Sequence, residues 1–473
     1  MIDNIILNAD SYKASHFLQY PPGTTQVSSY IEARGGEFRR AVFFGLQMFL
    51  KEYLTKPVTY ADVNEAKALL DAHGVPFNDQ GWRHIVDRHR GYLPIAIEAL
   101  PEGTVTPIQN AMVQVTNTDP ECAWLPSYVE TALLRAVWYP TTVATVSWNC
   151  RRLIERYLAE TADSAEGIEF KLHDFGARGA TSVEAAAIGG AAHLVNFQGT
   201  DTIGGIMAAG RYYGADMAGF SIPAAEHSTI TTWGREREAD AYANMLDQFA
   251  GPEKLVAVVS DSYDLWNAID HIWGDALKAR VEGTGGTLVI RPDSGDPVQI
   301  VTETIERLMN RFGSEVNAKG YRVLPPCVRV IQGDGISQRT IEDILKAMKQ
   351  RKQSAENVAF GMGGELLQKV NRDTMKFAMK ASAAKVGGVW RDVHKDPITD
   401  TDKRSKRGRL AVVREADGAL TTVREEARGQ RENLLVPVYK DGELLREYDF
   451  VEIRARANPF DQSLKHEGTT KVA

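Results

Sequence analysis

The sequence predicts an α/β protein whose central part is a β/α barrel, and two repeated patterns support this. Strand-like apolar runs recur every 26 to 41 residues between positions 173 and 364, as in VAVVS (256–260) and VRVIQ (328–332). Most intervals between them contain a helical pattern with apolar residues on one face, such as residues 297–309. Repeated strand–helix units form either a β/α barrel or a doubly wound sheet.

Polar residues follow these apolar runs at the point where each strand is expected to end. In a barrel, the carboxyl ends of all strands open at one mouth, so such residues converge although they are far apart in the sequence. The alternative is that each is an ordinary turn or helix-capping residue, which explains one aspartate better than a whole series. The series consists of His173, Asp201, His227, Asp261, Arg291, Asp293 and Asp334.

The region before the barrel is expected to contain helices and short antiparallel strands. Residues 1–42 are expected to be irregular. Amphipathic helices are predicted at 43–54, 60–73 and 80–92. Period-two alternation predicts strands at 95–100, 104–107 and 112–116. A long helix over 124–161 is expected to break near Pro140, because proline lacks the N–H that continues a helix.

The C-terminal region predicts two β-hairpins, which turn at Asp417-Gly418 and at Asp441-Gly442. The expected domains are therefore an N-terminal α+β part (1–160), a catalytic β/α barrel (161–380) and the C-terminal hairpins (381–473). The N-terminal strands and the C-terminal hairpins are expected to form one mainly antiparallel domain beside the barrel.

Composition narrows the class of protein. The chain has 473 residues, of which 43% are hydrophobic and 25% charged, as in an ordinary globular protein. A net charge of −7 offers no general attraction to nucleic acid or to an anionic membrane. No run reaches the roughly 18 apolar residues of a membrane span, and the N-terminus does not resemble a signal peptide. These features predict a cytoplasmic enzyme with no nucleic-acid or membrane partner.

The cysteines and two short motifs are not expected to carry chemistry. Cys122, Cys150 and Cys327 are widely spaced, which indicates small buried residues rather than a disulfide framework or a zinc site. The segment 284–287 (TGGT) precedes a strand instead of following one, so we interpret it as a turn rather than a phosphate loop. The basic run 403–409 is expected to face solvent or to bind small anions rather than nucleic acid.

The strand ends predict a site for phosphates and magnesium. Clustered carboxylates such as Asp261 and Asp293 need cations, and Mg²⁺ chelated by a diphosphate is a natural one. Arg291 and Arg178 match phosphate oxygens with planar guanidinium groups. The glycines at 361–364 precede a helical pattern and indicate a phosphate-binding turn. The ligand is therefore expected to carry both a monophosphate and a diphosphate.

His227 is predicted to be catalytic. It lies where a strand end runs into a helix, among the expected anion-binding residues. A lone histidine is more often a structural donor, but a histidine beside a polyphosphate can act as the nucleophile that accepts a phosphoryl group.

A series of motifs occurs in order along the chain. They are DSYK (10–13), YPP (20–22), KLHDFGARG (171–179), GTDT (199–202), PAAEHST (223–229), SDSYD (260–264), IRPDSG (290–295), VIQGDG (330–335), GGELLQK (363–369) and KRSK (403–406). With these motifs the chain resembles, over nearly its full length, the nicotinate/nicotinamide phosphoribosyltransferase family, the type II phosphoribosyltransferases, in a bacterial or phage form. The resemblance implies transfer of the phosphoribosyl group of 5-phosphoribosyl 1-diphosphate to nicotinamide, in NAD biosynthesis. It further implies Mg²⁺, ATP hydrolysis coupled through a phosphohistidine at His227, and a homodimer with active sites at the subunit interface.

The resemblance also assigns roles around the nicotinamide ring. Phe175 and the partner subunit's Tyr12 are expected to sandwich the ring. Asp201 is expected to accept a hydrogen bond from the carboxamide. Arg291 is expected to neighbour the ring and the diphosphate, and Ser221 to contact substrate.

Other residues are expected to bind the sugar and the phosphates. Asp293 is assigned a catalytic role on the ribose side, and Asp261 a catalytic role as the Mg²⁺–diphosphate residue. The remaining substrate-binding residues implied are Arg178, Gly333, Asp334, Gly363 and Gly364, with Arg372, Lys380, Lys395 and Lys403 contributed across the interface.

Three rival functions are weaker. A nicotinate-specific enzyme of the same fold is disfavoured by Asp201, which would repel a carboxylate. A barrel phosphohydrolase that uses His227 and the aspartates does not explain Tyr12 and Phe175. A non-enzymatic binding role does not require the intact set of strand-end residues.

Overall fold

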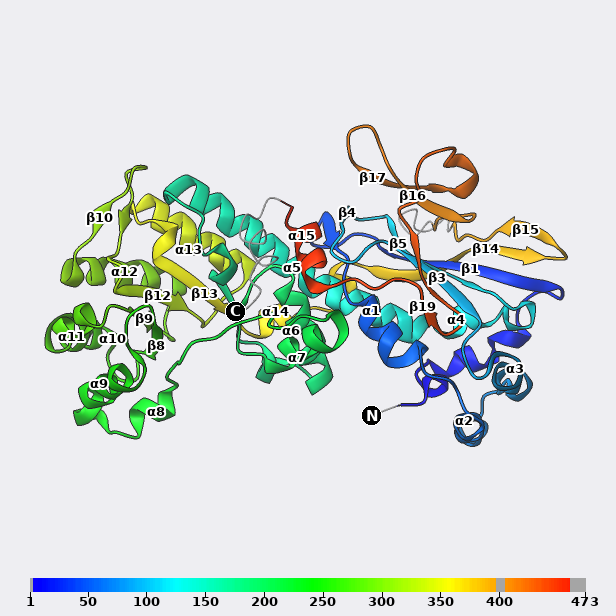
Figure 1. Ribbon diagram of the computed structural model, residues 1–473, viewed down its shortest axis with the longest axis horizontal. Helices are drawn as coiled ribbons and strands as arrows, with labels where there is room; N and C mark the ends of the chain where they lie inside the picture. Colours follow the sequence, from blue (N-terminus) through cyan, green and yellow to red (C-terminus); the bar gives the residue numbers. More distant parts are fainter. Residues whose placement is uncertain (1–2, 397–404, 460–473) are drawn as a thin grey trace, which may run out of the picture. The chain divides into compact units, whose positions relative to one another are not determined.

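The computed structural model describes residues 3–396 and 405–459, and the chain folds as two units (Figure 1). Unit 1 comprises Met1–Thr145, Ala208–Ala215 and Val370–Ala473. Unit 2 comprises Val146–Met207 and Asp216–Lys369. The chain passes from one unit to the other after Thr145, Met207, Ala215 and Lys369. The sequence analysis placed its domain boundaries at 160 and 380.

Unit 2 contains a six-stranded parallel sheet in the order β7-β6-β13-β12-β9-β8. The segment 220–224 joins the two edge strands through backbone hydrogen bonds. Thr200 N donates to Phe220 O (3.0 Å), and Ala257 N donates to Pro223 O (2.9 Å). The parallel α/β core predicted from the sequence is confirmed. The strands are β6 (Leu172–Asp174), β7 (Gly199–Thr200), β8 (Leu255–Val259), β9 (Thr287–Arg291), β12 (Val328–Gln332) and β13 (Val358–Met362).

The parallel strands are apolar on both faces because both faces are covered. Ala257, Val289 and Ile331 pack together on one face of the sheet, with Phe175 and Ile222 against them. The turn at 284–287 leads directly into β9, as expected.

Helices alternate with these strands and lie around the sheet (Figure 1). The side chain of Asp296 accepts from Gln299 N and starts α12, with Pro297 as the first helical residue. Ser337 and Thr340 form a reciprocal cap on α13. The helices are α6 (Val183–Leu194), α8 (His227–Thr231), α9 (Glu238–Phe249), α10 (Leu265–Asn267), the π-helical η8 (Ala268–Ala276), α11 (Lys278–Gly283), α12 (Pro297–Phe312), α13 (Gln338–Gln350) and α14 (Gly364–Leu367). A two-stranded ribbon, β10 (Glu315–Val316) and β11 (Arg322–Val323), follows α12.

Unit 1 is built on a seven-stranded antiparallel sheet in the order β15-β14-β1-β5-β3-β18-β19. Its strands come from both ends of the chain, as the sequence predicted for the antiparallel domain. They are β1 (Thr24–Ala33), β3 (Ile95–Ala99), β5 (Ala111–Asn117), β14 (Phe377–Val386), β15 (Val389–Asp392), β18 (Val436–Lys440) and β19 (Glu443–Leu444). Two smaller pairs are β2 (Arg40–Val42) with β4 (Val105–Pro107) and β16 (Leu410–Arg414) with β17 (Leu420–Arg424).

Strand β1 corrects the expectation that residues 1–42 are irregular. It is central in the sheet and pairs with β14 and β5. Its buried residues include Ser28, Ser29 and Glu32, so the alternation of apolar and polar residues is lost. Backbone pairing on both sides, rather than side-chain pattern, defines this strand.

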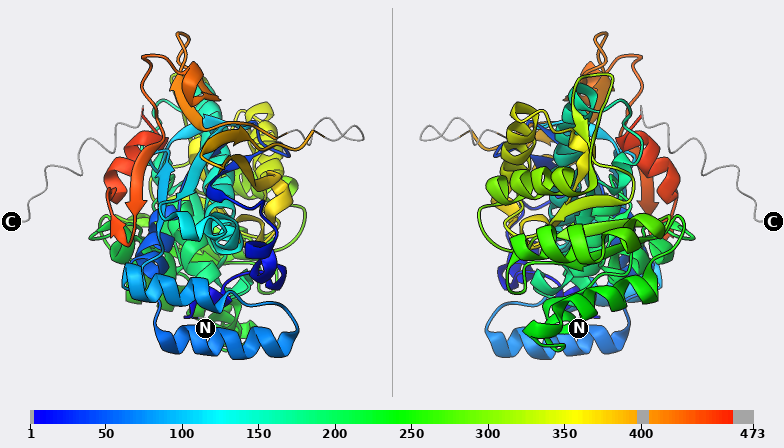
Figure 2. Two further views of the ribbon diagram at one scale, coloured as in Figure 1. Left: turned by 90° about the vertical axis from the view of Figure 1, so that its right-hand side faces the viewer. Right: turned by 90° about the vertical axis from the view of Figure 1, so that its left-hand side faces the viewer.

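Most predicted elements of unit 1 are confirmed, including both hairpins. Gly418 (φ 84°) and Gly442 (φ 94°) supply the left-handed backbone that their turns require. Helices α2 and α3 lie side by side (Figure 2). The helices are η1 (Ile5–Leu7), η2 (Ser11–Leu18), α1 (Leu46–Phe49), η3 (Leu50–Leu54), α2 (Tyr60–His73), α3 (Asp79–His89), η4 (Pro120–Cys122), α4 (Leu125–Tyr128), η10 (Arg372–Thr374), η12 (Glu425–Ala427) and α15 (Phe450–Ala457). The chain passes from one unit to the other within helices α5 (Glu130–Thr161) and α7 (Ile203–Tyr213).

The predicted break at Pro140 is wrong, because α5 continues through it. Pro140 leaves the Ala136 carbonyl without its helical N–H partner. Gly45 (φ 104°) approaches this place so closely that a Cβ there would lie 2.3 Å from the Pro140 ring and 3.3 Å from Ala136 O. Helix α5 therefore continues past Pro140, and the backbone at Gly45 packs closely against it there.

Two further expectations concern cysteines and membranes. Cys122 and Cys150 are buried as predicted, whereas Cys327 is partly exposed, and all three are free. Within the described part of the chain, the helices are too short or too polar to span a bilayer.

Candidate active site

A hydrogen-bonded network surrounds His227 at the carboxyl ends of β8 and β9. His227 begins α8, and its Nε2 donates to Asp261 Oδ1 at 3.1 Å. Asp261 is nearly buried, and its Oδ2 accepts from the backbone N–H of Asp293 at 3.1 Å and from the Ser294 hydroxyl. An ionised carboxylate only accepts, so Asp261 fixes the Nε2–H tautomer of His227 and leaves Nδ1 with its lone pair.

The Nδ1 side of His227 faces a second carboxylate. Asp293 Oδ2 lies 4.0 Å from Nδ1 and accepts a hydrogen bond from Arg291 at 2.9 Å. The guanidinium balances the charge of Asp293 and keeps this side of the site able to receive an anion.

Another network orders Asp201 at the ends of β6 and β7. His173 Nε2 donates to Asp201 Oδ1 at 2.9 Å, and the Ser221 hydroxyl donates to the same oxygen at 2.6 Å. Burial alone would raise the pKa of Asp201. The bonds from His173 and Ser221, with Arg291 nearby, hold that pKa below its usual value. Asp201 is therefore an ionised acceptor whose Oδ2 is left for another donor.

Phe175 adjoins the network around Asp201. Its ring is 5.0 Å from that of His173, and its N–H donates to Met362 O. A Cβ on Gly361 would lie 2.0 Å from the Phe175 ring, and a Cβ on Gly333 would lie 3.1 Å from it. Because Gly361 and Gly333 have no side chains, they leave room for the Phe175 ring.

Gly361→Ala is expected to displace the Phe175 ring, since a contact of 2.0 Å cannot persist. If the ring stacks on substrate, kcat/KM for the ring substrate should fall by roughly 10²-fold, the cost of about 1 Å of misplacement. Gly283→Ala is the matched control, because a Cβ there meets nothing within 4 Å. Steady-state kinetics of the two folded variants test this, and equal kinetics would contradict it.

The glycine turn after β13 lies beside the Arg178 segment. Gly363 and Gly364 start α14, which is only four residues long. A Cβ on Gly179 would lie 3.5 Å from Gly364 Cα, so the exposed Arg178 belongs to the same end of the sheet. Asp334 is exposed, and its carbonyl accepts from Gln332. Phosphate binding by these residues stays a prediction.

In unit 1, the predicted residues Lys380 and Lys395 form a cluster of cations with Lys13 and Arg34. Burial lowers the pKa of Lys380, Glu130 opposes this shift, and the other three cations add to it. Lys13 is 4% exposed and is ion-paired with Glu130.

Tyr12 adjoins this cationic cluster. It is 57% exposed, and Lys13 Nζ lies 5.3 Å from its ring centroid. His16, held by Ser127 at 2.9 Å, packs edge-on against the ring. An exposed aromatic beside several cations is a suitable surface for a ring that carries phosphate.

The basic C-terminal segment is anchored at its described end. Lys406 is ion-paired with the buried Glu32, and its N–H donates to Tyr30 Oη at 2.9 Å. The backbone N–H of Ser405 donates to Lys395 O at 3.0 Å, and the backbone N–H of Lys395 donates to the Ser405 hydroxyl at 2.8 Å. Arg372 is exposed on η10 and pairs with Asp373 at 3.1 Å. Lys403 lies outside the described residues.

The structure thus brings many of the predicted residues into two groups, whereas Arg178 and Gly364 lie together at the glycine turn and Arg372 pairs with Asp373 on η10. His227, Asp261, Arg291, Asp293, Asp201, Ser221, Phe175 and Gly333 adjoin one another in unit 2, whereas Tyr12, Lys380 and Lys395 gather in unit 1. Ser294, Arg34 and Glu130 were missed by sequence reasoning. Ser294 could have been predicted from its position directly after Asp293. Arg34 and Glu130 lie in no local motif that would have predicted them.

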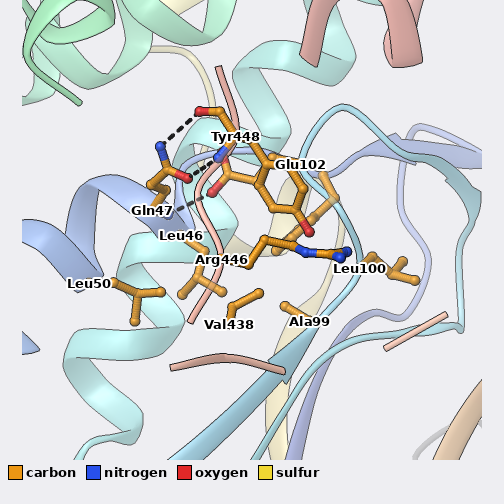
Figure 3. A pocket seen from close by; sticks show the side chains of 10 residues that line it. Leu46, Gln47, Leu50, Ala99, Leu100, Glu102, Val438, Arg446 and Tyr448 are labelled. Atoms are coloured by element: carbon orange, nitrogen blue, oxygen red, sulfur yellow. Dashed lines mark hydrogen bonds between the residues drawn. The ribbon is translucent and has the colours of Figure 1, made fainter. Parts of the chain in front are cut away.

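A separate hollow in unit 1 is not a candidate for the site (Figure 3). Apolar residues such as Leu46, Leu50 and Val438 line it, and Glu102 accepts the backbone N–H groups of Gly45 and Gln47 beside it. Its free space is about that of one water molecule, too small for a nucleotide.

Comparison with known families defines the class. Residues 170–443 match the nicotinate phosphoribosyltransferase (NAPRTase) family, and residues 4–97 match the nicotinamide phosphoribosyltransferase N-terminal domain. The chain belongs to the nicotinate phosphoribosyltransferase family.

Two curated relatives are similar to the chain over nearly its whole length. The chain is 55% identical to a nicotinamide phosphoribosyltransferase of Xanthomonas campestris pv. campestris, covering 97% of this chain and 98% of the relative. It is 33% identical to a protein of that name from Acinetobacter baylyi, covering 95% and 96%.

Solved structures share the fold. Nicotinate-nucleotide pyrophosphorylase from Pyrococcus furiosus superposes with a TM-score of 0.61 at 17% identity, covering 97% of this chain and 96% of the other. Human nicotinic acid phosphoribosyltransferase superposes with a TM-score of 0.58 at 17% identity, covering 95% and 92%.

Proposed function

We propose that the protein condenses nicotinamide with 5-phosphoribosyl 1-diphosphate to give nicotinamide mononucleotide and diphosphate, a step of NAD biosynthesis in the cytoplasm. The observation that carries the proposal is the ionised Asp201. Its Oδ1 is occupied by His173 and Ser221, and its Oδ2 is available to a carboxamide N–H. Two relatives over 30% identical bear the name of this activity.

The chemistry is displacement at the anomeric carbon of ribose. The lone pair of the pyridine nitrogen forms the new N–C bond while the C–O bond to diphosphate breaks, and the diphosphate leaves with that electron pair. Phe175 positions the ring, and Arg291 stabilises the charge that develops on the leaving group. No side-chain base is required, because the ring nitrogen attacks unprotonated.

The donor set fits magnesium carried by the diphosphate better than a metal bound in advance. Asp261 uses both oxygens on protein donors, whereas Asp293 Oδ1 and the exposed Asp334 carboxylate are open toward a ligand. Mg²⁺ held between the diphosphate and these carboxylates would neutralise the leaving charge.

We further propose that ATP hydrolysis drives the synthesis through His227. Nδ1 attacks the terminal phosphorus of ATP, an N–P bond forms, and the P–O bond to ADP breaks. Water then attacks the phosphorus of the phosphohistidine, the N–P bond breaks, and phosphate leaves. Asp261 holds the opposite nitrogen and stabilises the positive charge on the ring.

A product assay tests the function. Purified protein is incubated with phosphoribosyl diphosphate, Mg²⁺ and either nicotinamide or nicotinate, with and without ATP. The expected result is nicotinamide mononucleotide and diphosphate in equal amounts, with a faster rate when ATP is present. A preference for nicotinate would favour the nicotinate enzyme. Phosphate release from phosphoribosyl diphosphate in the absence of both ATP and a ring substrate would favour the phosphohydrolase.

We also propose a homodimer in which Tyr12 of one subunit completes the site around Phe175 of the other. The support is the family resemblance and the exposure of Tyr12 beside the cationic cluster in unit 1.

Mixing Tyr12→Ala with Phe175→Ala protein should therefore restore activity that neither variant has alone. One of the two sites in each heterodimer then contains both aromatics, so about a quarter of the wild-type activity per subunit is expected after statistical exchange, when half of the dimers are mixed. Activity is measured after subunit exchange, and unmixed variants are the controls. Full activity of a stable monomer would contradict the proposal.

A further inference from the structure

In unit 1, a cluster of histidine, aspartate and cysteine side chains lies outside the residues used above. His84 and His89 are on α3, while Asp119 caps η4 and Cys122 ends it. Asp119 Oδ2 accepts from His84 Nε2 at 2.7 Å and from His89 Nε2 at 2.6 Å. Metal-ligating atoms of His84, Asp119 and Cys122 all lie within 4.8 Å of one another.

We propose that His84, Asp119 and Cys122 bind a transition-metal dication, with Zn²⁺ the best match, and that His89 orients Asp119 as its hydrogen-bond donor. Nitrogen, oxygen and sulfur ligands together suit zinc, whereas Mg²⁺ and Ca²⁺ prefer oxygen alone. Tetrahedral zinc places such ligands about 3 to 4 Å apart, so the three groups need shifts of no more than about 1 Å.

The surroundings of Asp119 match those of a metal-ligating carboxylate. Three N–H groups, those of His84 Nε2, His89 Nε2 and Glu121 N, point at its two oxygens. Asp119 Oδ1 is fixed by Glu121 N at 2.9 Å, and His89 holds Oδ2, which is the kind of outer support that orients metal ligands.

Cys122 supplies the buried wall of the site. Cys122 is fully buried at the end of η4, where its thiol is shielded from solvent. When the metal–sulfur bond forms, the thiol proton leaves to solvent. The His84 side chain is 29% exposed and opens the cluster to solvent, which leaves a fourth position for water.

The widely spaced cysteines did not indicate this site, because its ligands come from two segments that the fold brings together. A metal here would link α3 to η4, at the end of β5. The site shares no residue with the His227 network, so its metal would take no part in the reaction proposed above.

Tag-free protein is stripped with a chelator and titrated with Zn²⁺ by calorimetry. The expected result is one Zn²⁺ per chain, retained in His227→Ala, together with a melting temperature that rises on zinc addition. His84→Gln should weaken binding by more than tenfold and abolish the thermal shift. His89→Gln should weaken it by roughly 10- to 100-fold, the usual effect of losing an outer partner. His73→Gln, on the neighbouring helix α2, is the control and should bind as the wild type does.

Cobalt substitution tests the sulfur ligand directly. Co²⁺ bound to a thiolate gives an intense near-ultraviolet charge-transfer band, which Cys122→Ser should lose and Cys327→Ser should keep. Should Cys122→Ser fail to fold, the band in His84→Gln carries the test, since weaker binding there must lower it. The proposal is overturned by zinc binding that His84→Gln leaves unchanged, by a cobalt complex without the thiolate band, or by no binding at all.

Discussion

Replacement of His227 by alanine is expected to abolish ATP hydrolysis and the acceleration that ATP gives to mononucleotide synthesis. His227 Nδ1 is the nitrogen left with a lone pair, because Nε2 donates to Asp261. Loss of a nucleophile removes the covalent route altogether, and a fall of roughly 10³-fold or more in ATP turnover is expected. Phosphate release and acid-labile labelling from γ-labelled ATP measure the two parts of this result.

Two companion variants show whether the loss is specific. Asp261→Asn keeps the nucleophile but removes the charge that fixes its tautomer, so a loss of roughly 10²-fold is expected. His271→Ala changes an exposed histidine on η8 and should behave as the wild type does. Unchanged ATP hydrolysis in His227→Ala would exclude the phosphohistidine.

The sequence located the polar strand ends well because each follows an apolar run that only a buried strand explains. Asp261, Arg291 and Asp293 could be assigned to one end of the sheet in this way. Their exact pairing could not, since it depends on Ser294 and on the backbone N–H of Asp293, which turn both Asp261 oxygens toward the protein. Asp261 is consequently better placed to orient His227 than to bind a metal by itself.

Other features were hidden because their cause is not local. Strand β1 contains buried serines and a buried glutamate, Glu32. The ion-pair partner of Glu32 comes from a distant part of the chain. Lys406 neutralises that glutamate from 374 residues away. Helix α5 passes Pro140 where Gly45 comes close. Sequence periodicity reflects local pattern and does not show such pairing between distant residues. It therefore predicts which residues lie near a site better than which hydrogen bonds and ion pairs they form.

Asp201→Asn is expected to reverse much of the preference for nicotinamide over nicotinate. In the wild type, nicotinate would place its carboxylate against an ionised Asp201, and a like-charge contact of this kind costs several kcal/mol. The carboxamide of nicotinamide instead donates to Asp201 Oδ2, a charge-assisted bond worth about 1.5–3 kcal/mol. Since about 1.4 kcal/mol corresponds to a factor of ten, the ratio of kcat/KM for the two rings should shift by roughly 10²-fold or more.

The hydrogen bonds at Asp201 predict the direction in which the preference between the two rings changes. His173 and Ser221 donate to Oδ1, so an asparagine should keep its carbonyl oxygen toward them and present its NH₂ group to the substrate. The pocket then offers a donor where it had an acceptor, which suits the carboxylate of nicotinate. Ser221→Ala removes one donor and leaves the charge, so it should weaken catalysis while retaining the selectivity. An unchanged ratio in Asp201→Asn would mean that discrimination lies elsewhere in the pocket, and an equal change in Ser221→Ala would mean that the position of the carboxylate, rather than its charge, selects the ring.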